Sequence, residues 1–159
     1  MRKVSMVGAV RVFFVLLLLS AAHVAWPQGK PDFSGQWKQD NDRCLPKRTG
    51  DVTLRIEHRD PALKVETSVS RDSASSRHAI QEYNTGGKVS VSTGADGDQF
   101  LTSIVWEHSN LVFSIEEHED GRILHSRETW SVNEDGGTLE KIRELPDGKK
   151  QILFFRRLP

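Results

Sequence analysis

The segment from Phe100 to Thr138 constrains the fold more than any other part of the sequence. It contains three stretches in which apolar and polar residues alternate, separated by two short turn sequences, His108-Ser109 and Asp120-Gly121. Alternation with a period of two is typical of a strand that buries one face, and Asp-Gly is a strong hairpin signal because both turn residues take positive φ. The segment is therefore predicted to form a three-stranded antiparallel meander.

Two-residue turns at these positions set a register, and the register sorts the side chains by polarity. Residues directly opposite each other in an antiparallel pair share a face of the sheet. One face then comprises Ile104, Trp106, Leu111, Phe113, Ile115, Leu124, Trp130 and Val132, whereas the other comprises Ser103, Ser114, Glu116, His118, His125 and Arg127. A sheet with one apolar and one polar face indicates an antiparallel β protein that covers only the apolar side.

The same pattern continues on both sides of this meander. Residues 52–58 and 63–69 alternate around Asp60-Pro61, and a tight turn there pairs opposite charges on one face and β-branched residues on the other. Further turn sequences follow at 85–87, 94–97, 135–137 and 146–148. A long meander closes most simply into a barrel without free edges. We predict an all-β fold, an antiparallel up-and-down meander β-barrel of about 8–10 strands, with room inside for side chains or one small ligand.

The first 25 residues have the pattern of a secretory signal peptide. Arg2 and Lys3 form a basic start, an uninterrupted apolar run extends from Val12 to Leu19, and Ala25 lies in a group of small residues suited to cleavage. A membrane-spanning helix needs about 20 apolar residues, so a retained anchor is the less favoured alternative. We expect an exported protein, periplasmic or secreted, with a single domain over residues 26–159.

The charge balance excludes several classes of partner. The chain has 22 basic (Lys, Arg) and 22 acidic (Asp, Glu) residues; three of the basic and none of the acidic residues lie in the first 25, which leaves 19 against 22 and a net charge near −3. Without a basic excess, the domain has no field that would attract nucleic acid or an anionic membrane. We expect no nucleic-acid partner and no membrane insertion after signal cleavage; the oligomeric state stays open.

Cys44 is the only cysteine, so no intrachain disulfide can form. A small exported domain without disulfides must be stabilised by a hydrophobic core. Because Cys44 lies in the polar run 40–46, we expect a thiol near solvent with no role. The alternative is an intermolecular disulfide or a reactive thiol.

The residues Phe33-Ser-Gly-Gln-Trp37 resemble the Gly-x-Trp signature of lipocalins and the wider calycin group. Further matching landmarks are 56–61, 106–111, 128–130, 135–139 and 154–157. Together they make the chain similar to secreted bacterial lipocalin-like proteins with an N-terminal Phe-Ser-Gly-x-Trp motif, although no clear C-terminal helix follows. The resemblance implies a calycin barrel in which Arg157 or Arg156 packs over the ring of Trp37 and plugs the barrel base. It supplies no activity, because fold alone does not imply function.

The predicted interior is not purely apolar, because Glu128 falls on it. A turn at Asp135-Gly136 places Arg143 opposite Glu128, whereas a register slipped by one residue would turn Glu140 and Ile142 inward. Apolar walls with a few convergent polar groups are typical of a small-ligand site, and Arg can bind a carboxylate bidentately. The alternative is a structural ion pair in a filled core. The candidate lumen residues are Trp37, Trp106, Phe113, Glu128, Trp130, Arg143 and Arg157.

Other clusters point to no chemistry of their own. Glu116, His118 and His125 lie near one another on the outer face of one hairpin, but a solvated polar face is favoured over a Zn²⁺ or Cu²⁺ site because the two His are offset diagonally. The sequence contains no nucleophile elbow, His-Glu-x-x-His, phosphate loop or Cys-x-x-Cys. We therefore expect no metal and no cofactor, and we assign no catalytic residue.

Three functional hypotheses follow. The first is an exported lipocalin-like barrel that binds a small hydrophobic or carboxylate ligand in its lumen. The second is a non-catalytic envelope interaction module or enzyme inhibitor with a filled barrel core. The third is an enzyme that uses Glu128 as acid or base, which a raised carboxyl pKa beside a cavity would favour. An enzyme is the less expected outcome.

Overall fold

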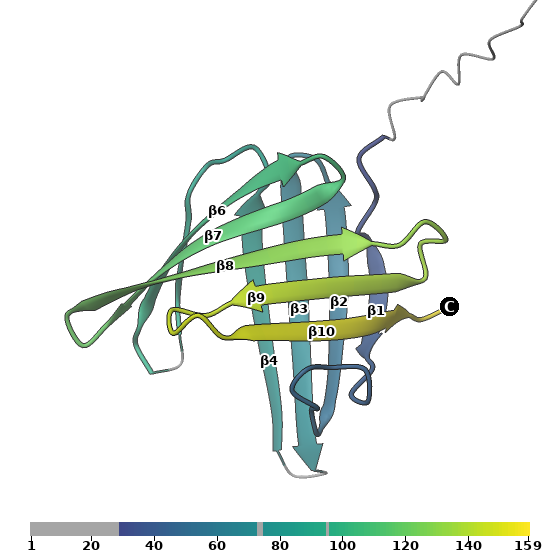
Figure 1. Ribbon diagram of the computed structural model, residues 1–159, viewed down its shortest axis with the longest axis horizontal. Helices are drawn as coiled ribbons and strands as arrows, with labels where there is room; N and C mark the ends of the chain where they lie inside the picture. The colour runs from purple at the N-terminus through teal and green to yellow at the C-terminus, as the bar shows by residue number, and fades with distance from the viewer. Residues whose placement is uncertain (1–28, 73–74, 95) are drawn as a thin grey trace, which may run out of the picture.

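The computed structural model describes residues 29–72, 75–94 and 96–159 (Figure 1). The predicted signal peptide, residues 1–25, lies outside the described residues. Within these ranges no helix has the length and apolar character needed to cross a bilayer.

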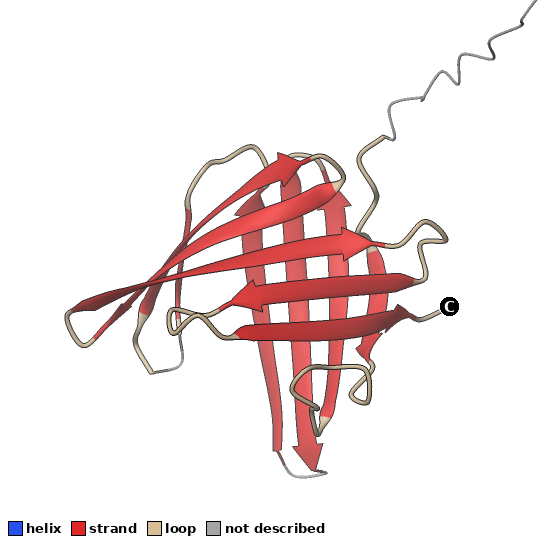
Figure 2. Cartoon of the chain, in the orientation of Figure 1, coloured by secondary structure: helices blue, strands red, loops and turns tan. Residues whose placement is uncertain are grey.

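The described residues form ten antiparallel strands in a single sheet (Figure 2). The strands are β1 (Gly35–Gln39), β2 (Asp51–Arg59), β3 (Ala62–Asp72), β4 (Ser75–Asn84), β5 (Ser90–Thr93), β6 (Gln99–Glu107), β7 (Asn110–Glu119), β8 (Arg122–Val132), β9 (Thr138–Glu144) and β10 (Lys150–Arg157). Their order is β4-β3-β2-β1-β10-β9-β8-β7-β6-β5, so all consecutive strands except β4 and β5 are neighbours, and the first strand pairs with the last. This confirms the predicted up-and-down meander.

The sheet folds over on itself into a nearly closed barrel. Figure 1 shows β2, β3 and β4 crossing behind β8, β9 and β10 at a steep angle. The right-handed twist of strands makes a long meander curl in this way. The two layers face each other across an interior that holds the core.

The predicted registers are confirmed at the turns that define them. Across Asp120-Gly121, Phe113 pairs with Glu128, and across the Asp60-Pro61 turn, Glu57 pairs with Lys64. Asp120 and Gly121 both have positive φ, at 48° and 75°, as the turn chemistry requires. The turn after β8 gives the unslipped register, in which Arg143 is opposite Glu128. The alternative that turned Glu140 and Ile142 inward is therefore wrong.

The core comes from the inward faces of eight strands and from Phe33, which directly precedes β1. Its buried members are Phe33, Trp37, Leu54, Ile56, Leu63, Val65, Ile104, Leu111, Phe113, Trp130, Leu139 and Phe155. These side chains concentrate toward the end of the barrel at which the β1–β10 pair carries Trp37 and Arg157. Large apolar side chains fill that end, so the barrel has a closed base.

Arg157 plugs this base, as the resemblance to lipocalins implied for Arg157 or Arg156. Its guanidinium carbon lies 4.2 Å from the centroid of the Trp37 ring, a cation–π distance. Its Nε donates to Gly136 O at 2.7 Å, and its other two nitrogens donate to the carbonyls of Ser34 and Asp32. The side chain therefore ties the last strand to the segment before β1 and to the β8–β9 turn.

Closure of the barrel is incomplete, contrary to the expectation of a barrel without free edges. Among the described residues β4 and β5 stand at the two ends of the strand order and share no ladder. Their connection is held elsewhere, since Thr85 N donates to Pro61 O and Gly87 N donates to Ile104 O, both at 2.8 Å. These bonds direct the connection toward β3 and β6, so β4 and β5 do not continue it as a hairpin.

Cys44 is buried, so the expectation of a thiol near solvent is wrong. Its side chain is fully covered, and Sγ lies 3.2 Å from the carbonyl oxygen of Asp40, to which it donates. The loop between β1 and β2 folds against β10, because Leu45 forms an isolated bridge with Ile152 and Arg48 donates to Gln151 Oε1 at 2.7 Å. The polar loop thus covers its one thiol.

Candidate functional site

The barrel encloses a cavity of about 300 Å³ above the packed base. It is lined by inward-facing residues of seven strands, namely Val65, Thr67, Gln81, Tyr83, Ser92, Phe100, Thr102, Phe113, Ile115, Glu128, Trp130, Lys141 and Arg143. Apolar side chains form part of the wall, and charged groups of β8 and β9 form another part. We refer to this cavity as the lumen.

Glu128 is the buried carboxylate of the lumen. Its side chain is 11% exposed, Oε1 lies 3.1 Å from Lys141 Nζ, and Trp130 Nε1 donates to the same oxygen. Burial by itself would raise the pKa of this carboxyl. The Lys141 ammonium, the Trp130 hydrogen bond and the Arg143 guanidinium outweigh burial and lower the pKa below its ordinary value. Glu128 is therefore an ionised hydrogen-bond acceptor at neutral pH.

Lys141, which the sequence analysis left out of the candidate lumen residues, is the ion-pair partner of Glu128. Its ammonium also lies 4.3 Å from the ring centroid of Trp130 and 5.9 Å from that of Phe155. The predicted register is right, but the predicted pairing of Glu128 with Arg143 is corrected, because Lys141 is in contact with the carboxylate. The register that places Arg143 opposite Glu128 also places Lys141 opposite Trp130, which was the signal that Lys141 faces inward as well.

Arg143 brings a second positive charge to the lumen without an ion-pair partner among the described residues. Its Nη2 is 3.4 Å from Ser126 Oγ, a long hydrogen bond, and its Nε is buried with no hydrogen-bond partner in the described part of the chain. A buried N–H without an acceptor costs free energy, and buried cations are usually paired. Arg143 therefore lines the lumen with a guanidinium that has an unused donor.

Tyr83 forms the wall of the lumen on the β4 side. Its ring packs edge-on against Phe113, with centroids 5.8 Å apart. Burial raises the pKa of the Tyr83 phenol, and the carboxylate of Glu128 raises it further, against the influence of Arg143. The phenol is therefore neutral and can donate a hydrogen bond.

The structure brings together four of the seven predicted lumen residues. Phe113, Glu128, Trp130 and Arg143 line the cavity. The other three, Trp37, Trp106 and Arg157, belong to the base: Trp37 is fully buried there, Arg157 covers it, and Trp106 bonds to Asp60. Alternation along a strand predicts which side chains face the interior, but it does not tell one end of a barrel from the other, and Arg157 lies exposed over the base.

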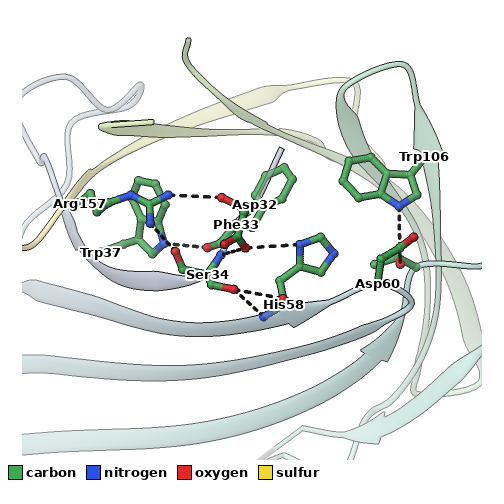
Figure 3. A network of polar contacts seen from close by, with 9 residues as sticks. Asp32, Phe33, Ser34, Trp37, His58, Asp60, Trp106 and Arg157 are labelled. Carbon is green, nitrogen blue, oxygen red and sulfur yellow. Dashed lines mark hydrogen bonds and ion pairs between the residues drawn. The ribbon is translucent and has the colours of Figure 1, made fainter. Parts of the chain in front are cut away.

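A polar network surrounds the base (Figure 3). Asp60 accepts from Trp106 Nε1 at 2.9 Å and from Thr85, and it lies 2.7 Å from Lys30 Nζ. These contacts hold the pKa of the Asp60 carboxyl far below its ordinary value, with the Lys30 contact first among them. The network fixes the β2–β3 turn against β6 and the β4–β5 connection.

His58 is a buried titratable side chain next to this network. Its ring lies between Phe33 and Trp106, with centroids 5.8 and 5.7 Å away, and its Nδ1 is 4.0 Å from Asp32 Oδ1. Its Nε2 is buried without a hydrogen-bond partner among the described residues. Burial lowers the pKa of the His58 imidazole, against the attraction of the carboxylates of Asp32 and Asp60. The ring is therefore neutral at neutral pH.

The outer-face cluster forms one close contact. His118 Nε2 lies 2.6 Å from Glu116 Oε1, and both side chains are more than a third exposed. In the described part of the chain no group of three His, Cys, Asp or Glu side chains is placed to hold a metal ion.

Comparisons with known proteins give a fold and no family. No family model and no curated protein matches the chain. Among solved structures it is similar to secretory abundant heat soluble protein 4 from Ramazzottius varieornatus, at 13% identity and a TM-score of 0.65, over 82% of this chain and 97% of that chain.

Two further similar structures are of proteins named for fatty acids. One is the REP1-NXSQ fatty acid transporter, at 12% identity and a TM-score of 0.57, over 80% of this chain and 97% of that one. The other is fatty-acid-binding protein 1 of Echinococcus granulosus, at 11% identity and a TM-score of 0.55, over 80% and 98%. Likeness at such identities shows the fold alone, an all-β calycin-like barrel.

Proposed function

We propose that the lumen binds a small, partly apolar anion and that Arg143 holds its carboxylate. The observation that carries this proposal is the buried Arg143 Nε, which has no acceptor among the described residues. A carboxylate can accept two parallel bonds from the fork of an Arg, and such charge-assisted bonds are about twice as strong as neutral ones. The apolar part of the ligand packs on Phe113 and Ile115.

The charges of the lumen favour an anion over a cation. Three charged side chains line the cavity, and Glu128 with Lys141 forms one neutral pair, so Arg143 leaves a net positive charge. A ligand of matching charge removes the cost of this isolated cation in a site of low dielectric. A neutral ligand would leave the guanidinium as it is.

The size and walls of the lumen fit a small ligand. Ligand pockets occupy about 300–1,000 Å³, and the lumen is at the lower end of this range. Two proteins of the same fold are named as a fatty acid transporter and a fatty-acid-binding protein. Those names belong to other proteins, and here they support a carboxylate with an apolar tail as the first probe to test.

Octanoate tests the proposal by isothermal titration calorimetry at low salt. The wild-type protein is expected to bind octanoate, and Arg143→Met is expected to lose at least about tenfold in affinity, because a charge-assisted bond contributes roughly 1.5–3 kcal/mol. Arg143→Met should fold well, since replacing a buried, poorly paired cation by an apolar side chain costs little.

Arg127→Met is the matched control. Arg127 lies on the neighbouring strand β8, faces outward and pairs with Glu107 at 2.7 Å, with 48% of its side chain exposed. The control removes the same charge without touching the lumen. Equal octanoate affinity in the wild type, Arg127→Met and Arg143→Met would overturn the proposal, as would an absence of binding to the wild type.

The two alternative functions have less support from the site. The interaction module was expected to have a filled core, whereas the lumen is open over about 300 Å³. The enzyme was expected to raise the pKa of Glu128, whereas the surroundings lower it. An acid or base that is held in an ion pair with Lys141 is also poorly placed to exchange a proton with a substrate.

We also propose that the chain is exported and belongs with secreted bacterial lipocalin-like proteins. The basic start and apolar run of residues 1–25 support export, and the Phe33-Ser-Gly-Gln-Trp37 motif supports the grouping. N-terminal sequencing of the protein from a secreting host is expected to begin near residue 26. A product that begins at Met1 in the exported fraction would overturn it.

A further inference from the structure

A second hollow, of about 600 Å³, lies between β4 and β5, where the barrel wall is unpaired. Its walls are Ile80–Asn84 on one side and Lys88–Ser92 on the other. Among the described residues the two strands share no ladder, and their connection bonds instead to Pro61 and Ile104 through Thr85 and Gly87. We call this hollow the lateral opening.

The lateral opening adjoins the lumen. Gln81, Tyr83 and Ser92 line both hollows. Gln81 and Tyr83 face inward from β4, opposite Val65 and Leu63 of β3, and Ser92 faces inward from β5, opposite Phe100 of β6. The same side chains thus form the side wall of the lumen and the inner rim of the opening.

The outer rim of the lateral opening is apolar and exposed. Ile80 on β4 is 53% exposed, and Val89 and Val91, before and on β5, are 52% and 61% exposed. Three large aliphatic side chains around one hollow form a local apolar patch, which is more informative than single exposed residues. Water contact with this patch is unfavourable by roughly 25 cal/mol per Å² of apolar surface.

We propose that the ligand of the lumen is an amphiphile whose apolar tail leaves the barrel sideways, through the lateral opening, and packs on Ile80, Val89 and Val91. This inference rests on the proposed function, because it takes Arg143 as the head-group site. It names the ligand class more narrowly, as anions with a tail too long for the lumen alone.

The volumes and polarity of the two hollows support this division. The lumen offers about 300 Å³ and holds the charged groups, whereas the opening offers about 600 Å³ and has the exposed aliphatic rim. The base cannot take the tail, because Trp37, Phe33 and Phe155 fill it with no exposed surface beyond 1%. When the head group is held at Arg143, the side of the barrel is therefore the apolar route that remains for a longer tail.

A comparison of octanoate with hexadecanoate separates the contribution of the head group to affinity from that of the tail. Each is titrated into the wild type and into Ile80→Ser/Val91→Ser, at concentrations below micelle formation. The double variant is expected to keep octanoate affinity within about twofold and to lose about tenfold or more for hexadecanoate, the size expected from removing two aliphatic contacts. Both residues are more than half exposed, so the variant should fold.

Ile123→Ser is the matched control. Ile123 is 54% exposed, almost the same as Ile80, but it lies on β8 next to the Asp120-Gly121 turn and lines neither hollow. Its substitution should leave both affinities unchanged. A second readout is backbone amide NMR, in which hexadecanoate should shift Ser90 and Val91, and octanoate should leave them in place.

The outcomes distinguish this inference from the proposed function. If octanoate binds through Arg143 but the double variant keeps its full hexadecanoate affinity, the lateral route is overturned and the lumen site stands. If the double variant loses both ligands equally, the opening does not separate head from tail and the inference is likewise overturned. If the wild type binds neither carboxylate, both proposals are overturned.

Discussion

Lys141 Nζ lies 3.1 Å from Glu128 Oε1, and the two side chains are only 15% and 11% exposed. This buried ion pair is set diagonally across β8 and β9, since the residue directly opposite Glu128 is Arg143. The pair neutralises the one carboxylate of the lumen and leaves Arg143 for a ligand. The same two residues give the first test of the energetics of the lumen.

Removing Lys141 is expected to cost on the order of 3–5 kcal/mol in the free energy of unfolding, because it leaves a buried carboxylate without its partner. Lys141→Met, Glu128→Gln and the double variant form a cycle measured by urea unfolding at neutral pH. We expect a coupling above about 1 kcal/mol. The exposed pair Arg127–Glu107 is the control cycle, with an expected coupling below about 1 kcal/mol. Additive effects at Glu128 and Lys141 would contradict the ion pair.

Acid should remove the contribution of Glu128. Its pKa in the folded protein is lowered from the ordinary value of 4.5. The folded state therefore holds the proton less tightly than the unfolded state, and the stabilisation is fully present above about pH 4.5 and lost as the pH falls through the folded pKa. Glu128→Gln should lose less stability than the wild type between neutral pH and about pH 3, by urea unfolding. Glu107→Gln, at an exposed carboxylate, should follow the wild-type curve, and an identical curve for Glu128→Gln would contradict the prediction.

The registers could be read from the sequence because turns and alternation constrain them twice. At Asp120-Gly121 the two-residue turn sets the pairing, and a slip of one residue would have turned Phe113 and Trp130 to solvent. The place of an Arg over Trp37 was implied by the resemblance to lipocalins, which left Arg157 and Arg156 open, and the structure selects Arg157. A period-two pattern predicts which face a side chain is on because successive side chains of a strand alternate between the two faces of the sheet.

Features that depend on three-dimensional packing could not be read in this way. Lys141 and Arg143 both face the lumen from β9, and only the side-chain arrangement decides which of them contacts Glu128. Cys44 lies in a loop without periodicity, so its burial against β10 has no sequence pattern. The missing ladder between β4 and β5 could not be predicted either. Gly86 and Gly87 indicate a hairpin turn, whereas the connection bonds to Pro61 and Ile104.

His58 should make the protein sensitive to mild acid. Burial lowers the pKa of its imidazole from the ordinary value of 6.5, so below that pH the unfolded state binds a proton that the folded state does not. The stability that the neutral His58 contributes is therefore fully present above about pH 6.5 and falls as the pH drops toward the pKa of His58 in the folded state. The stability of His58→Leu, measured by thermal unfolding, should depend less on pH in this window than that of the wild type. His125→Leu, at an exposed His, is the control, and a wild-type slope in His58→Leu would contradict a buried neutral His58.

Gly35→Ala is expected to destabilise the barrel through its contact with Arg157. Gly35 has a φ of 133°, and a Cβ there would lie 2.8 Å from Arg157 Nη1. That nitrogen belongs to the end of a long side chain, but hydrogen bonds to Gly136, Ser34 and Asp32 hold the guanidinium in place. The backbone strain alone costs on the order of 1–3 kcal/mol, and moving the guanidinium adds to it.

Arg157→Met separates the two contributions, because it removes the steric contact and leaves the φ of Gly35 unchanged. Urea unfolding of Gly35→Ala, Arg157→Met and the double variant should show a smaller cost of Gly35→Ala in the Arg157→Met background, with a coupling above about 0.5 kcal/mol. Arg156→Met is the matched control, since Arg156 is exposed and points to Asp40. A full cost of Gly35→Ala in both backgrounds would assign the whole effect to backbone strain and contradict the close approach of Arg157.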